Sequence, residues 1–318
     1  MEIKRGYERM PGRRGRGFDR AFLPMDFVSF LEASGLSTPV YNLFEIIGDE
    51  KAFSEFHFEC ILNKDKIQRC LEVYLRKGGF PRAVRDVLSN GELEEETFEI
   101  YKSVIFSEFE KQRRSPALLM GLLRRLYESV GTPVSYASLS QDTALSNVRA
   151  VQDYLEILGA AFLGFTLPCV DLNRRLAYPK RPREFFAIDP IIWNVVRKSS
   201  GLSPLQTAFL AEQAVAIHLM RLQADRWASL GSPEGLYYWQ SKKGKEVDFV
   251  FYVPATQRPF GVEVKYQGRV SGWDEMSIKK GIGQGVLVTR DTFKWGDVYQ
   301  IPLWAFLLLS FRHDTFPL

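Results

Sequence analysis

The segment 237–265 constrains the fold more than any other part of this 318-residue chain. Residues 247–253 and 260–265 are rich in β-branched and aromatic side chains, and turn residues separate the two runs. This pattern predicts an antiparallel β-hairpin. A turn centred midway between the runs places Asp248 opposite Glu263, where cross-strand Cβ atoms lie about 5 Å apart. Two carboxylates are therefore expected to share a small space.

Three charged side chains are expected to converge on this hairpin. Strand alternation puts Glu263 and Lys265 on one face, and Asp248 joins them from the partner strand. Adjacent carboxylates repel unless a cation or a proton lies between them, and oxygen ligands suit Mg²⁺ or Mn²⁺. A lysine beside such an ion can orient water or hold a phosphate. The implied chemistry is metal-assisted phosphodiester hydrolysis, with these three residues as the candidate catalytic groups.

The hairpin resembles the D…(D/E)-x-K signature of the PD-(D/E)xK nuclease superfamily through its runs E-V-D-F-V-F and V-E-V-K. Families of that fold usually add an acidic residue from a preceding helix. Residues 208–222 predict an amphipathic helix at that place, and Glu212 is its one acidic residue. The resemblance implies a restriction-endonuclease-like α/β/α domain in which Asp248, Glu263 and Glu212 bind the metal. It also implies that Lys265 positions the attacking water or the phosphate.

The region 132–200 has the order of a winged helix. A short helix begins at 135–139, a second helix covers 147–158, and two strands follow at 161–167 and 185–188. The second helix exposes acidic as well as basic residues, so the basic wing between the strands is the better phosphate contact. The candidate nucleic-acid contacts are the basic residues of this wing and of the turn before Asp248: Arg174, Arg175, Lys180, Arg181, Lys242 and Lys243.

Residues 1–35 are unusual for the start of a chain. Arg13, Arg14, Arg16 and Arg20 lie among glycines, ahead of the run L-P-M-D-F-V-S-F-L, in which a short helix is expected to begin. One interpretation is a basic arm. The other is the end of an AAA-type domain, because the stretch resembles the run G-R…L-x-P-L-S-F-x-E-F that closes this domain in a large family of archaeal and bacterial ATPases.

The chain resembles that ATPase family at further points, in the same order. These are Y-L-R-K-G-G-F-P-R-A-V at 74–84, F-A-I-D-P-I-I-W-N-V-V at 186–196 and the hairpin itself. The family carries a C-terminal domain of unknown function. Its members begin with a P-loop, G-x-x-x-x-G-K-[ST], and this sequence contains none. We therefore expect no nucleotide site in this chain and no ATP hydrolysis by this chain alone.

Composition adds weaker constraints. The net charge of +4 permits nucleic-acid contact without requiring it. Cys60, Cys70 and Cys169 form no C-x-x-C pair, and the Arg-rich start has no apolar core of a secretory signal, so a cytoplasmic protein is expected. The most apolar late run, 301–309, is too short to cross a bilayer and predicts a buried terminal helix, so no membrane association is expected.

The sequence thus predicts an α/β chain of four parts. Residues 1–35 form the basic arm or domain remnant, 36–131 a helical segment, 132–200 a winged helix, and 201–318 the nuclease-like α/β/α domain. Two functions remain open. One is a Mg²⁺- or Mn²⁺-dependent hydrolase of DNA phosphodiesters. The alternative is a non-catalytic module that binds DNA, a protein partner or a separate ATPase domain, because charged residues on exposed strands also form solvated ion pairs.

Overall fold

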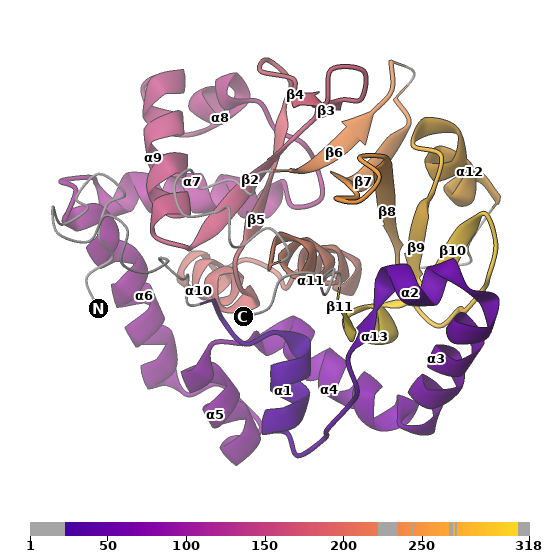
Figure 1. The fold of residues 1–318 in the computed structure, drawn as a ribbon. Helices are drawn as coiled ribbons and strands as arrows, with labels where there is room; N and C mark the ends of the chain where they lie inside the picture. The colour runs from indigo at the N-terminus through magenta and orange to yellow at the C-terminus, as the bar shows by residue number, and fades with distance from the viewer. Residues whose placement is uncertain (1–22, 222–234, 243, 267–269, 271, 311–318) are drawn as a thin grey trace, which may run out of the picture.

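The computed structural model describes residues 23–221, 235–242, 244–266, 270 and 272–310. The described chain is a mixed α/β structure, with most helices in its N-terminal part and a five-stranded mixed sheet in its C-terminal part (Figure 1). The predicted fold class is therefore confirmed. None of the described helices has the length and apolar character needed to cross a membrane.

The N-terminal helices pack through helical stripes of apolar residues. The helix over 64–77 buries Ile67, Leu71, Tyr74 and Leu75 on one face, as its spacing predicts, and ends at Gly78. The helices of this region are α1 (Phe27–Ala33), α2 (Leu43–Gly48), α3 (Glu50–Leu62), α4 (Lys64–Lys77), α5 (Pro81–Asn90), α6 (Glu95–Glu110) and α7 (Pro116–Glu128).

A buried carboxylate ties the turn between α4 and α5 to a helix far along the chain. Asp189 is 2 % exposed and caps α10 (Pro190–Ser200) by accepting from the Ile191 N–H at 2.8 Å. Its other oxygen accepts from the Gly79 N–H at 2.7 Å. A Cβ at Gly78 would lie 1.9 Å from Asp189 Oδ1, and one at Gly79 would lie 2.1 Å from the Met25 carbonyl oxygen. The Gly-Gly-Phe-Pro run is therefore a packing requirement of this junction.

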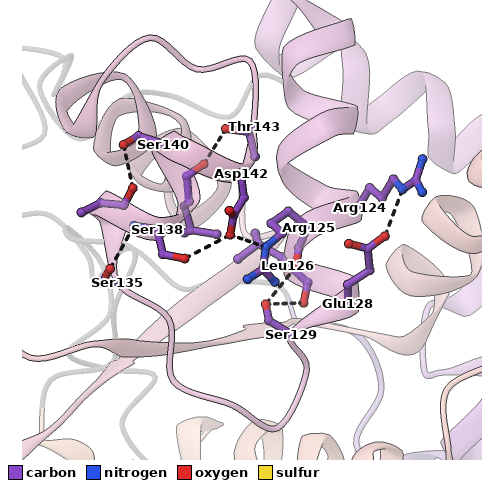
Figure 2. A network of polar contacts seen from close by, with 12 residues as sticks. Arg124, Arg125, Leu126, Glu128, Ser129, Ser135, Ser138, Ser140, Asp142 and Thr143 are labelled. Atoms are coloured by element: carbon purple, nitrogen blue, oxygen red, sulfur yellow. Dashed lines mark hydrogen bonds and ion pairs between the residues drawn. The ribbon is translucent and has the colours of Figure 1, made fainter.

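The central region contains two helices followed by an antiparallel pair of strands, in the order that the sequence predicts. After α7 come α8 (Tyr136–Asp142) and α9 (Val148–Ala160), and β2 (Gly164–Pro168) then pairs antiparallel with β5 (Arg183–Ala187). Figure 2 shows how α8 is fixed to α7: the Arg125 guanidinium and the Ser138 hydroxyl both donate to Asp142 Oδ2, at 2.8 and 3.0 Å. Between β2 and β5, β3 (Val170–Asp171) and β4 (Leu176–Ala177) form a short antiparallel pair in the segment where the wing is expected.

The C-terminal sheet has the strand order β10-β9-β8-β7-β6. The β6–β7 and β7–β8 pairs are antiparallel, whereas β8–β9 and β9–β10 are parallel. Along β9, Val286 and Val288 enter the main core and Leu287 enters a smaller cluster beneath α12 (Gly272–Gly281), so both faces of the sheet are covered. The strands are β6 (Leu236–Gln240), β7 (Glu246–Tyr252), β8 (Pro259–Lys265), β9 (Gly285–Thr289) and β10 (Val298–Pro302).

Two helix predictions are wrong in instructive ways. The apolar run 301–309 is not one helix, since it holds the end of β10, the short α13 (Leu303–Phe306) and the start of β11 (Leu309–Ser310). The helix expected at 208–222 exists as α11 (Thr207–Arg221), but it is buried on nearly all sides rather than amphipathic. It packs against β5, β8 and α4 at once, so it has no wide solvent face.

The packing crosses the expected segment boundaries. The strand β1 (Tyr41–Asn42) pairs parallel with β11, and Phe53 and Phe56 of α3 contact the Phe293 ring with centroids 6.2 and 5.9 Å apart. A single cluster of buried apolar side chains runs from α1 to β11. The helices after residue 36 therefore form part of the same core as the C-terminal sheet.

Candidate functional site

The β7–β8 hairpin has the predicted register. Phe249 pairs with Val262 and Phe251 with Phe260, so continuing the ladder by one residue places Asp248 opposite Glu263. A slip of one residue would exchange the two faces of the strand and would put Asp248 where the buried side chains of Val247 and Phe249 now pack. The expected hairpin is confirmed, and the two carboxylates are neighbours.

Backbone groups and one lysine hold these carboxylates in place. The Val264 N–H donates to Asp248 Oδ2 at 2.7 Å, and the Asp248 N–H donates to Glu263 Oε2 at 3.3 Å. The Lys265 ammonium lies 2.7 Å from Glu263 Oε1. Glu263 is only 5 % exposed. The Lys265–Glu263 ion pair therefore differs from the solvated pairs that charged residues form on exposed strands.

Glu212 reaches the same place from α11. Burial raises its pKa well above the usual value, and the charges of Asp248 and Glu263 raise it further, whereas Lys265 lowers it. Its Oε2 also lies 3.5 Å from the position that a Cβ on Gly131 would occupy, in the turn between α7 and α8. Glu212 therefore lies beside the turn between α7 and α8 and within electrostatic reach of Asp248, Glu263 and Lys265, which are in contact with one another on the hairpin.

Two further carboxylates belong to this cluster and were missed in the sequence. Glu246 is two residues before Asp248 on β7 and accepts from the Gln240 side chain at 3.1 Å. Glu184 on β5 is 4 % exposed, and its charge interacts with those of Glu246, Glu212 and Asp248. Glu246 has a local signal, because residues two apart share a strand face. Glu184 has only a weak one, a lone carboxylate in the apolar strand R-E-F-F-A.

We call these five residues the acidic centre: Glu184, Glu212, Glu246, Asp248 and Glu263. Burial raises the pKa of Asp248 to about 6 and that of Glu263 to about 8, where the charge of Asp248 adds to the effect. Lys265 opposes both shifts. One lysine beside five carboxylates leaves excess negative charge in a partly desolvated place, which favours uptake of protons or of a cation.

The donor chemistry fits a hard divalent ion, because every member of the acidic centre offers carboxylate oxygens. Asp248, Glu263 and Glu212 would hold such an ion. Within the described residues, however, no group of three His, Cys, Asp or Glu side chains already converges on one metal position. Glutamates have three rotatable side-chain bonds, so ligation would require their carboxylates to turn from Lys265 and from the backbone toward the ion.

The basic wing (Arg174, Arg175, Lys180 and Arg181) lies beside the start of this hairpin. Cys169, at the base of the wing, forms an isolated parallel β-bridge with Tyr238 of β6. The Arg181 guanidinium donates to the Gln240 side chain at 3.4 Å. Gln240 in turn bonds Glu246 of the acidic centre. The Lys242 side chain is exposed in the following turn. Lys243, the remaining candidate contact, lies outside the described residues.

The raised carboxyl pKa values predict how stability depends on pH without metal. A carboxyl whose pKa is higher in the folded than in the unfolded state stabilises the fold at low pH and loses this contribution as pH rises through the folded pKa. For Glu263 the window ends near pH 8. We expect the stability of Glu263→Gln relative to wild type to rise by about 4 kcal/mol between about pH 5 and 8 in EDTA.

Chemical denaturation at several pH values measures this difference. Saturating Mg²⁺ should reduce it, because the cation then replaces the proton as counter-charge. A difference between variant and wild type that stays constant with pH in EDTA would contradict the raised pKa of Glu263.

Comparison with protein-family models assigns two parts of the chain. Residues 68–197 match a domain of unknown function (DUF8612), and residues 208–306 match a domain of unknown function (DUF4143). Searches of curated proteins and of solved structures found no match. Glu184 lies in the first matched segment and the other members of the acidic centre lie in the second. The two matched segments therefore meet at one cluster of carboxylates.

Proposed function

We propose that this chain is the C-terminal part of an AAA-type ATPase-family protein and carries a divalent-metal-dependent nuclease-like domain that acts on DNA. The observation that supports it best is the meeting of Asp248, Glu263, Lys265 and Glu212 at the end of a hairpin in a mixed sheet. The assignment to the ATPase family rests on the resemblance of the sequence motifs, together with the match to the domain of unknown function over 208–306.

Each site residue has a distinct part in this proposal. A bound Mg²⁺ or Mn²⁺ supplies an activated water and neutralises charge on the phosphate oxygens. Asp248 and Glu263 would hold the ion, with Glu212 as the accessory ligand from α11. Lys265, whose ammonium already lies among these carboxylates, would release Glu263 and position the water or the scissile phosphate. The chain itself thus contributes placement and charge.

The basic wing supports DNA as the substrate. Arg174 is exposed and its charge is only weakly paired, with Asp171 Oδ2 at 3.8 Å, while Arg175 and Arg181 stack over Tyr252 and Tyr178 at 5.7 and 5.8 Å. Cations fixed over aromatic rings beside the hairpin would receive a phosphate backbone without reading its sequence. The wing then holds the strand whose phosphodiester faces the acidic centre.

A cleavage assay tests this function. The purified protein is incubated with branched, single-stranded and duplex DNA in Mg²⁺, Mn²⁺ or EDTA, and wild type is compared with Asp248→Asn. Metal-dependent products that disappear in the variant support the proposal. Equal cleavage by both proteins would exclude a role for this site and indicate a contaminating nuclease.

A non-catalytic binding module is the second candidate, and one observation favours it: within the described part of the chain no three ligands are preformed around a metal position. This candidate predicts DNA retention, or capture of a protein partner, that survives Glu263→Gln. It shares the basic wing with the first candidate and differs only in the acidic centre.

Under either candidate, the wing predicts salt-dependent DNA binding. We expect Arg174→Ala combined with Lys180→Ala to weaken duplex binding about tenfold and to reduce the slope of log K against log salt by about 2, because two phosphate contacts are lost. Fluorescence anisotropy at several salt concentrations measures both. Lys51→Ala with Lys66→Ala removes two exposed charges from α3 and α4, far from the wing (Figure 1), and should change neither. Equal slopes in all three proteins would exclude the wing as a phosphate contact.

A further inference from the structure

Glu184 is the least expected member of the acidic centre. It lies on β5, where Phe185, Phe186 and Ala187 are also buried, and it is itself 4 % exposed. Its Oε2 has no hydrogen-bond partner in the described part of the protein. A buried carboxylate oxygen without a partner is costly, since it has lost its water and gained nothing in return. Either a bound cation or a proton shared with the neighbouring Glu246 carboxyl would offset this cost.

The strand β5 lies next to the elements that carry the other carboxylates. The Tyr238 hydroxyl donates to the Pro182 carbonyl at 2.8 Å, which holds the start of β5 against β6. On its other side β5 packs on α11, and α11 packs on β8. The charges of Glu212, Asp248 and Glu246 each raise the pKa of Glu184, so all three lie within electrostatic reach of it.

We propose that Glu184 is a ligand of the divalent cation bound at the acidic centre, so that the metal site is built jointly by the winged helix and the hairpin. The inference rests on the proposed function, because it takes the acidic centre to be a cation site. It goes beyond the D…(D/E)-x-K pattern, which contains no residue equivalent to Glu184. A cation between Glu184 and the hairpin satisfies the orphaned Oε2 and offsets the charge of its neighbours.

A shared proton is the competing arrangement. A protonated Glu184 could donate to Glu246, and the pair would then need no metal. The two arrangements differ in what the isosteric change Glu184→Gln does, because glutamine replaces a protonated carboxyl with little loss but is a poor ligand for Mg²⁺ or Mn²⁺.

Calorimetric titration of the whole chain with MnCl₂, without DNA, distinguishes them. We expect Glu184→Gln to weaken Mn²⁺ binding about 10- to 100-fold, the scale on which residues supporting a metal site act. Asp86→Asn is the matched control, since Asp86 is equally buried at 1 % exposure but bonds Arg85, the Glu94 N–H and Thr97 instead. Its Mn²⁺ affinity should equal that of wild type. Circular dichroism verifies that each variant folds.

The outcomes separate this inference from the proposed function. Weakened binding in both Glu184→Gln and Asp248→Asn supports it. Unchanged binding in Glu184→Gln, with binding lost in Asp248→Asn, overturns the role of Glu184 and leaves the nuclease-like site intact. No binding to wild type overturns both. If Glu184→Gln does not fold, anomalous diffraction from wild-type crystals soaked in MnCl₂ decides: a peak bonded to Glu184 supports the inference, and its absence there rejects it.

Discussion

Asp248→Asn is expected to reduce the rate of metal-dependent DNA cleavage about 100- to 1,000-fold, which corresponds to about 3–4 kcal/mol of lost transition-state stabilisation. The change removes one negative charge from the proposed metal ligands and keeps the shape and volume of the side chain. Asparagine keeps a carbonyl oxygen that can accept from the Val264 N–H, which Asp248 now binds at 2.7 Å. The variant should therefore unfold cooperatively, like wild type.

The matched control for this change is Asp297→Asn. Asp297 also lies in the C-terminal part of the chain, but outside the hairpin. Its side chain is 75 % exposed and forms an ion pair with Lys279. Its cleavage rate should equal that of wild type. The measurement is the initial rate at saturating Mn²⁺, so that a weakened metal affinity is separated from lost chemistry. A rate within about threefold of wild type for Asp248→Asn would contradict the proposed role.

Asp189→Ala is expected to lower the free energy of unfolding by about 3–5 kcal/mol, the largest effect on stability that we predict. The change leaves two buried backbone N–H groups, those of Gly79 and Ile191, without an acceptor. It also empties the space that Gly78 leaves for the carboxylate. Because Asp189 links α10 to the turn between α4 and α5, its removal should loosen the packing of all three helices.

Asp49→Ala provides the comparison. Asp49 also caps a helix, accepting from the Lys51 and Ala52 N–H groups at 3.3 and 3.2 Å, but it does so in solvent. Its removal should cost about 1 kcal/mol, as for an ordinary N-cap. Urea denaturation of the two variants and wild type measures both values. Equal losses in the two variants would show that Asp189 acts only as a cap and does not hold the Gly78-Gly79 turn.

The hairpin was predictable because its determinants are local. Aromatic and β-branched residues alternate along β7 and β8, turn residues lie between them, and the register follows from symmetry about the turn. The approach of Asp248 to Glu263 then needs no knowledge of the rest of the chain. The same holds for the buried face of α4, where Ile67, Leu71 and Leu75 repeat with the helical period.

What escaped prediction depends on contacts between distant segments. Whether α11 exposes a face is decided by β5, β8 and α4, which a helical period cannot reveal. Glu184 joins the acidic centre only because β5 packs on α11, some 28 residues from Glu212 along the chain. The apolar run 301–309 was ambiguous for another reason, because short buried strands and helices have the same composition.

The parallel pairing of Tyr41 with Leu309 has a practical consequence for dissecting this protein. A fragment starting near residue 201 would lose Phe53 and Phe56 of α3, which are ring partners of Trp295 and Phe293. Such a fragment would present these aromatic rings to water and tend to self-associate. Expression of the residues after about 201 alone is therefore a poor route to an assay, and biochemical work should retain the first helices.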